Sequence, residues 1–207
     1  MKKRLWLALS VLSIMAVGVG TTFAIFSANV STNSAFTSGS LCITSERNDG
    51  DPVPGPMFYV TSAQGQTPLG IPGTLPTGVW APGDTHVRTL TIYNPASCST
   101  MNAWIDTVQA TMHPGGYLPM ADKLWVELYT PQAGGPDVKI GEGWMSQFLA
   151  GPVPVSYPGG GRIPLYLSSN RHMKFRVHFD IGADNSYQDK TLVIDFTVNG
   201  SQMPNNP

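Results

Sequence analysis

The sequence predicts a mainly β protein, a jelly-roll β-sandwich with long loops and one or two short helices. About eight short runs alternate apolar and polar residues, as half-buried strands do. Clusters of small and turn-forming residues separate these runs, and the 22 glycines and 18 prolines argue against long helices. A length of 207 residues suits one domain with a sizeable core. An immunoglobulin-like sandwich is the alternative, because alternation alone does not determine strand order.

Residues 1–24 have the features of a secretory signal peptide. Three cations at residues 2–4 precede an uncharged apolar run of about 16 residues, shorter than the roughly 20 that a spanning helix needs. Small residues then flank Phe23, which predicts cleavage between Ala24 and Ile25, with Ala28 as the competing site. An uncleaved membrane anchor is the alternative interpretation.

Charge and hydropathy limit the partners of the mature chain. Removing the three cations of the signal changes a formal charge of −1 to about −4, so nucleic-acid binding has little electrostatic support. No later segment is apolar enough to span a bilayer. We therefore expect a secreted protein, in the extracellular matrix or at the cell surface, with signal peptidase as a processing partner and no membrane contact after cleavage.

The two cysteines, Cys42 and Cys98, are predicted to form one disulfide, because an even count in an oxidising compartment favours pairing. The bond would close a loop of roughly 57 residues, worth about 4 kcal/mol in the chain-entropy model. Two unpaired thiols are the alternative. A metal site is disfavoured, since two cysteines without a nearby histidine do not provide four ligands.

The segment Ile25–Phe36 is predicted to form the first strand after the signal. Its even positions, most of them apolar, are Phe26, Ala28, Val30, Thr32, Ser34 and Phe36. A strand that begins at a free N-terminus can pair within its own sheet or complete the sheet of a neighbour. Side-chain burial alone does not offset the ordering of this segment, so a hydrogen-bond ladder is needed. A strand inserted between two others forms a hydrogen-bond ladder on each side, whereas a strand at an edge forms one. The energetics therefore favour insertion between two strands over docking at an edge.

Further strands follow in order. We expect them at residues 41–44, 57–61, 86–93, 102–112, 123–130, 163–167, 172–181 and 191–198, with a long ordered loop at residues 62–85. The inward faces are predicted to carry Leu124, Val126 and Leu128; Met173, Phe175, Val177, Phe179 and Ile181; and Leu192, Ile194, Phe196 and Val198.

Two further elements have weaker patterns. In the strand at residues 102–112, Trp104, Val108, Ala110 and Met112 are assigned to one face. Residues 143–149 are predicted to form a short helix that buries Trp144, Met145 and Phe148.

Four motifs, in order along the chain, carry a resemblance to a known family. They are Thr21-Thr22-Phe23-Ala24-Ile25-Phe26-Ser27, Ala35-Phe36-Thr37-Ser38-Gly39-Ser40-Leu41, Trp80-Ala81-Pro82-Gly83-Asp84 followed by Leu90-Thr91-Ile92-Tyr93-Asn94, and Asn185-Ser186-Tyr187-Gln188 before the last strand. In these motifs the chain resembles the TasA and camelysin family of secreted bacterial proteins. The cysteine pair, the low charge and the proline-rich loop at residues 51–82 depart from the family pattern.

The resemblance implies a structural subunit of extracellular biofilm-matrix fibres, with a signal peptide at residues 1–24, a donor strand at 25–36 and a jelly roll at 37–207. Neighbouring copies of the chain would be its main partners, joined head to tail by donor-strand exchange, and a minor anchoring or nucleating matrix protein would be a second partner. The donor interface maps onto Ile25, Phe26, Ala28, Val30, Thr32, Ser34 and Phe36. Folding back into the same subunit would make identical contacts.

Two rival functions belong to other classes. Camelysin carries a metallopeptidase label in parts of the family, yet none of the four histidines lies in a His-Glu-x-x-His pair, and no Gly-x-Ser-x-Gly elbow occurs. We therefore predict no catalytic residue, metal ligand or cofactor; Glu46, Asp49 and Asp51 are assigned to a solvated acidic turn rather than a calcium loop. The other rival is a monomeric cell-surface carbohydrate-binding module, with a sugar platform drawn from Trp80, Trp104, Trp125 and Trp144.

Overall fold

Two antiparallel β-sheets make up the fold. The computed structural model describes residues 27–30, 41–47, 58–60, 80–132 and 134–203. The first sheet has the order β1 (Ser27–Val30), β11 (Leu192–Gln202), β5 (Ala103–Met112) and β8 (Val153–Pro154). Two short strands extend it: β3 (Phe58–Val60) also pairs with β11, and β9 (Ile163–Leu165) also pairs with β5.

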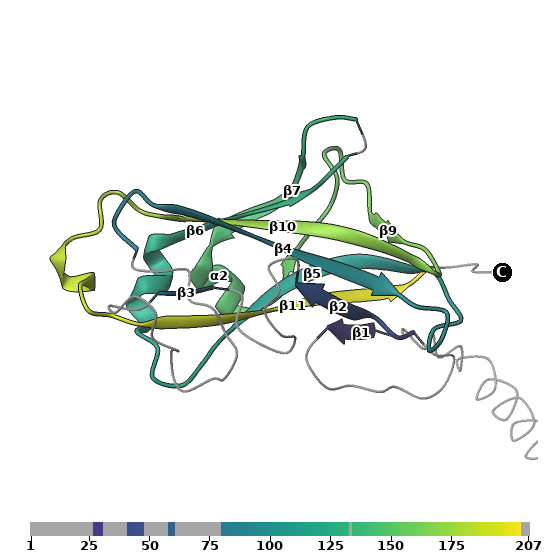
Figure 1. The fold of residues 1–207 in the computed structure, drawn as a ribbon, viewed down its shortest axis with the longest axis horizontal. Coiled ribbons are helices and arrows are strands. Elements are labelled where there is room, and N and C mark those ends of the chain that lie inside the picture. Colours follow the sequence, from purple (N-terminus) through teal and green to yellow (C-terminus); the bar gives the residue numbers. More distant parts are fainter. Residues whose placement is uncertain (1–26, 31–40, 48–57, 61–79, 133, 204–207) are drawn as a thin grey trace, which may run out of the picture.

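The second sheet has the order β2 (Thr44–Arg47), β4 (Thr85–Asn94), β10 (Ser169–Phe179), β6 (Leu124–Thr130) and β7 (Val138–Trp144). Figure 1 shows the two layers, with β4, β6 and β10 above β5 and β11. Strand β10 is the centre of its sheet, because it pairs with β4 from Ser169 to His178 and with β6 from Lys174 to Phe179.

The strand order defines a jelly roll rather than an immunoglobulin-like sandwich. Strands pair in nested fashion from the ends of the chain inward: β1 with β11, β4 with β10, β5 with β8 and β9, and β6 with β7. Two further pairs, β11 with β5 and β10 with β6, join these pairs into the two sheets. The predicted fold class is thereby confirmed.

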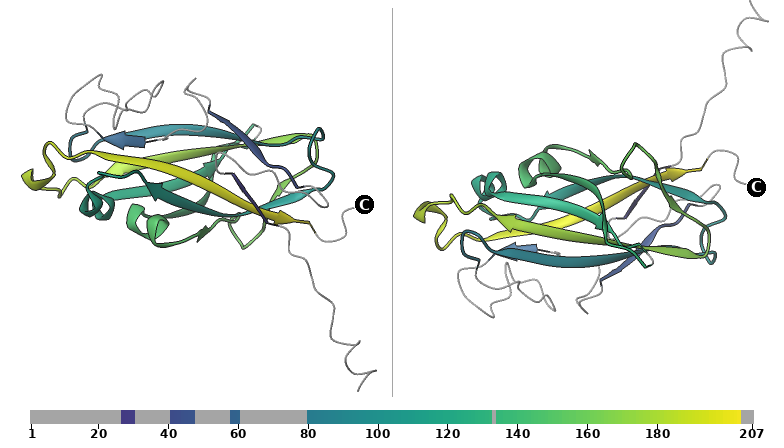
Figure 2. Two further views of the ribbon diagram at one scale, coloured as in Figure 1. Left: turned by 90° about the horizontal axis from the view of Figure 1, so that it is seen from below. Right: turned by 90° about the horizontal axis from the view of Figure 1, so that it is seen from above.

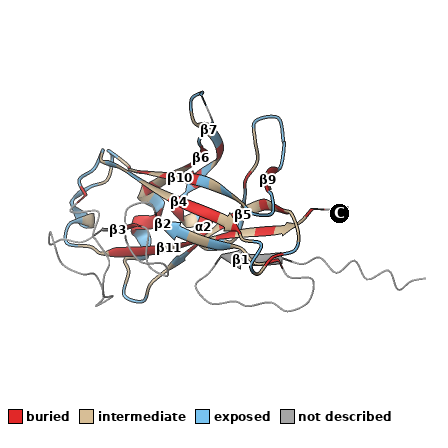
Figure 3. Cartoon of the chain, turned by 45° about the vertical axis from the view of Figure 1, so that its right-hand side comes forward, coloured by how far each residue is buried: buried red, intermediate tan, exposed pale blue. Residues whose placement is uncertain are grey.

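The core lies between the sheets, where the strands present their apolar faces (Figure 3). The predicted inward residues of β6, β10 and β11 are buried, and one α-helix, α2 (Met145–Ala150), adds Met145 and Phe148 to the same cluster. Two 3-10 helices complete the described elements: η2 (Leu118–Lys123) and η3 (Asn185–Tyr187). Figure 2 shows η3 at the end of the molecule opposite the last residues of β11.

Two sequence predictions about the long strands are wrong. Ile181 is 82% exposed, because β10 ends at Phe179 and the Gly182 N–H donates to the Asp180 carboxylate in a tight turn. Trp104 lies on the outer face of β5, because the register shifts between Asn199 and Gly200. This β-bulge leaves one extra residue in β5. The β5 residues before the bulge therefore face the opposite side of the sheet from the one that simple alternation predicts.

Other boundaries also differ from expectation. The strand expected at residues 41–44 begins three residues later, as β2. It starts directly after the segment that the disulfide holds. Strand β7 was not predicted, since two glycines interrupt its alternation. A side chain at Gly141 would press on Val155, and one at Gly143 would meet the Gln147 amide. Trp144 ends β7, so it is partly exposed instead of buried in α2.

Candidate functional site

The segment predicted to be exchanged is partly described, as β1. Ala28 lies opposite Gly200 and Val30 opposite Val198, so these two residues pair with β11 of the same chain. Among the described strands β1 has β11 as its single neighbour, so it lies at an edge and not between two strands as the sequence energetics favoured. The other predicted donor residues and the cleavage site lie outside the described residues: Ala24, Ile25, Phe26, Thr32, Ser34 and Phe36.

The surface that receives β1 is built from the end of β11. Val198 is 1% exposed, so this part of β11 presents its alternate residues to the core. At Gly200 the chain passes close to its neighbours: an added Cβ would lie 2.5 Å from the Trp104 carbonyl oxygen and 3.0 Å from Ile43. The absence of a side chain at Gly200 therefore lets β11 approach β5 at the bulge, at the position that pairs with Ala28.

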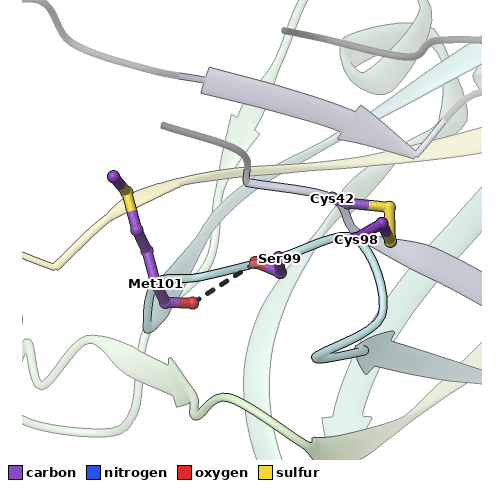
Figure 4. Close-up of a disulfide and its surroundings, with 4 residues drawn as sticks. All are labelled: Cys42, Cys98, Ser99 and Met101. Carbon is purple, nitrogen blue, oxygen red and sulfur yellow. Dashed lines mark hydrogen bonds between the residues drawn. A yellow bond between two sulfur atoms is a disulfide. The ribbon is translucent and has the colours of Figure 1, made fainter. Parts of the chain in front are cut away.

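The predicted disulfide is present and ties down the chain just before β2. Cys42 and Cys98 have Cα atoms 5.6 Å apart and join the segment Leu41–Ile43 to the loop between β4 and β5 (Figure 4). That loop is itself ordered, since the Cys98 and Ser99 N–H groups both donate to the Pro95 carbonyl. The covalent link closes a loop over a sequence separation of 56 residues.

The turn before β4 has the hydrogen bonding expected of its Pro-Gly-Asp sequence. The Asp84 carboxylate accepts from the Ala81 N–H at 2.6 Å, and the Asp84 N–H donates to the Ala81 carbonyl at 2.9 Å. Gly83 has φ +95°, a conformation that glycine adopts without strain. Asp84 therefore caps this turn through both its side chain and its backbone.

The four histidines occupy separate positions, each with a local partner. His86 stacks on the buried Trp80 ring at 4.1 Å, and burial lowers its pKa because desolvation disfavours the imidazolium. His113 contacts Asp195 at 2.8 Å, and His172 contacts the Thr91 hydroxyl at 2.9 Å. Over the described residues, no three His, Cys, Asp or Glu side chains gather as a metal site.

The outer face of the β4–β10–β6–β7 sheet carries a charged network that the sequence did not predict. The Glu127 carboxylate is 2.6 Å from Lys139 Nζ and 2.9 Å from His178 Nε2. The other ring nitrogen of His178 lies 2.7 Å from the Thr85 hydroxyl. Partial burial acts to raise the pKa of Glu127, but the hydrogen bonds from Lys139 and His178 outweigh it and lower that pKa to about 2.

The tryptophans do not form one platform. Trp80 is in the core, against Phe58, whereas Trp104 lies under the Arg162 guanidinium at 4.9 Å on the outer face of the other sheet. Trp125 and Trp144 meet edge to face at 5.1 Å across β6 and β7.

Comparisons with known proteins add little. No family model matches the chain, and no curated protein matches it. One similar solved structure is the C-terminal domain of a chitobiase from Bacteroides fragilis, at 15% identity over 58% of this chain and 67% of that chain, with a TM-score of 0.26. The class of protein is therefore defined by its own strands: a disulfide-bonded jelly-roll β-sandwich whose first described strand lies at a sheet edge.

Proposed function

We propose that this protein is a secreted structural subunit that polymerises head to tail into extracellular fibres, without a catalytic site. In the fibre, β1 of one copy pairs with β11 of the next. The observation that carries the proposal is the place of β1, which is joined to the fold through one four-residue ladder on the edge of β11. A second copy can supply the same strand and make the same pairs.

The nested topology favours an open chain of subunits. Because β1 pairs with the last strand of the jelly roll, donation joins the leading part of one copy to the closing strand of another. Donor and acceptor are then different surfaces, and such a heterologous contact generates a filament unless the rotation closes a ring.

Three other edge strands, β7, β8 and β9, are poor sites for strand addition. Strand β7 has a register shift opposite Leu128 and Tyr129 and carries the charged Lys139 and Glu142. Strands β8 and β9 are two and three residues long, and each contains a proline. Bulges, charges, prolines and short length are the devices that prevent pairing at an edge. The β1 side of β11 is therefore better suited to assembly than the edges at β7, β8 and β9.

One further observation agrees with an extracellular location. The Cys42–Cys98 disulfide is typical of an oxidising compartment. Within the described ranges, no helix combines the length and apolar character that crossing a bilayer requires. The resemblance of the four sequence motifs to the TasA and camelysin family supports the same function.

Electron microscopy of two tagged proteins tests the proposal. One has a short tag fused ahead of Ile25, and its matched control has the same tag after Pro207. We expect fibres from residues 25–207 and from the C-terminally tagged control, and none from the N-terminally tagged protein, because its donor strand no longer begins at a free end. Normal fibres from the N-terminally tagged protein would contradict assembly through β1. A casein assay with and without chelator tests the metallopeptidase alternative on the same samples.

A further inference from the structure

Two separate strands share one edge of β11. Strand β1 pairs with Val198–Ser201, and β3 pairs with Leu192–Ile194. Both run antiparallel to β11, so the C-terminal end of β1 and the N-terminal end of β3 face each other across the stretch Asp195–Thr197. On this edge no described strand pairs with that stretch.

In this window, Phe196 is the described residue whose backbone groups face the edge shared by β1 and β3. The Thr191 and Val193 carbonyls accept hydrogen bonds from Tyr117 and His113, on the β5 side of β11. Successive residues of a strand direct their N–H and C=O groups to opposite edges. The backbone of Phe196 therefore points toward the edge shared by β1 and β3, between the two ladders.

Strand β3 is held by its side chain as well as by its ladder. The Phe58 side chain is 3% exposed, and its ring meets Trp80 at 6.3 Å and Phe196 at 6.2 Å, both edge to face. Phe196 in turn contacts Phe175 at 4.7 Å and Phe148 at 6.1 Å. Displacing β3 would remove Phe58 from this aromatic cluster, so β3 is a fixed boundary for any strand that adds beside it.

We propose that β3, anchored by Phe58, is a stop that fixes the register of β1 from a second copy on the edge of β11. This inference rests on the proposed function. In the register observed, Val30 pairs with Val198 and Ser27 with Ser201. The smallest slip that keeps the same residues facing the core is two positions.

Each direction of slip meets a limit. A slip of two positions toward β3 would place Val30 opposite Phe196. Because Phe58 pairs with Ile194, a single β11 residue would then separate the incoming strand from β3. A slip away from β3 would carry Ser27 past Gln202, the last residue of β11, and lose pairs. The observed register therefore keeps all four pairs of β1 and leaves the stretch Asp195–Thr197 between β1 and β3.

Register-specific crosslinking tests this stop. Asn29 pairs with Asn199 in the observed register. Thr197 and Asp195 lie on the same face of β11 as Asn199, and they would pair with Asn29 after one and two such slips toward β3. Chains carrying Asn29→Cys are co-assembled with chains carrying Asn199→Cys, Thr197→Cys or Asp195→Cys, and disulfide-linked dimers are quantified. We expect the Asn199 acceptor to crosslink about tenfold more than the Thr197 acceptor, since a slip sacrifices ladder hydrogen bonds and crowds β3.

Weakening the anchor completes the experiment. Phe58→Ala in the acceptor chain should raise crosslinking at Thr197 to within about twofold of that at Asn199. Phe58→Leu retains an apolar side chain, so it should raise crosslinking at Thr197 by less. Phe148→Ala is the matched control, because it removes another ring from Phe196 without touching the edge. It should leave the ratio unchanged.

The outcomes separate the two proposals. Equal crosslinking at Asn199 and Thr197 with Phe58 intact, or an equal shift from Phe148→Ala, would overturn the stop and leave head-to-tail assembly standing. No intermolecular crosslink at any of the three acceptors would overturn the assembly itself.

Discussion

At the scale of single residues, Gly200 combines the tightest backbone approach with the site of β1 pairing. A Cβ there would lie 2.5 Å from the Trp104 carbonyl, and a backbone atom cannot move aside as a flexible side chain does. We predict that Gly200→Ala lowers the free energy of unfolding by about 2 kcal/mol. Urea denaturation measures this, with Gly151→Ala as the control because an added Cβ at Gly151 meets nothing within 4 Å. Equal stability of the two variants would contradict the crowding at the bulge.

Glu127 is the residue whose charge should matter most in acid. Its folded pKa of about 2 is below the ordinary value of 4.5, so its stabilisation is fully present above about pH 4.5 and is lost as the pH falls toward 2. Lys139 is 40% exposed and solvent screens the pair, so we expect a contribution of about 1 kcal/mol.

The melting temperature between pH 5 and pH 2 tests this expectation. Glu127→Gln should lose less stability over that range than the unaltered protein does. Glu142→Gln, which removes the other and more exposed carboxylate on Lys139, should keep the original acid dependence. An unchanged acid dependence in Glu127→Gln would show that another carboxylate is responsible.

At the scale of elements, strands with clean alternation were predictable and those with local irregularities were not. The inward faces of β6, β10 and β11 follow from sequence, since every second residue is apolar. The facing of Trp104 was not predictable, because the bulge depends on how β5 meets Gly200. Strand β7 was hidden by glycines that are needed where β8 and α2 approach it. The charged network around Glu127 joins the consecutive strands β6 and β7 to β10, which is distant in sequence, and only the strand order brings β10 beside them.

The disulfide also belongs to this scale, because it secures the entry to β2. Replacing both cysteines by serine removes a cross-link over a separation of 56 residues, and we expect a loss of about 4 kcal/mol. Equilibrium unfolding with and without reductant measures it. The reductant should destabilise the original protein and leave the Cys42→Ser, Cys98→Ser variant unaffected. If reduction leaves the original midpoint unchanged, the bond does not stabilise the fold.

At the scale of the whole molecule, the sandwich should persist without its first strand. The long pairs of β11 with β5 and of β10 with β4 and β6 do not involve β1. The nested strand order confirms the jelly-roll sandwich that the sequence predicted. The Cys42–Cys98 bond confirms the predicted pairing of the two cysteines. The exchange of β1 between copies stays a prediction, since pairing within one chain and pairing between chains use the same residues.

Deletion of Ile25–Ser34 is expected to abolish fibres and to leave a folded, β-rich monomer. Circular dichroism and electron microscopy provide the two measurements. A synthetic peptide of residues 25–34 should raise the melting temperature of the deletion variant, because it restores the missing ladder. A scrambled peptide of the same composition is the control. Fibres formed by the deletion variant would contradict assembly through this segment.

The position of the disulfide has a mechanical consequence for the proposed filament. Tension arriving through β1 reaches Leu41 and Cys42 before it reaches β2. The sulfur–sulfur bond then passes the load directly to the corner between β4 and β5, in the body of the sandwich. Strand β2, with only four residue pairs, is spared from peeling away when the filament is pulled.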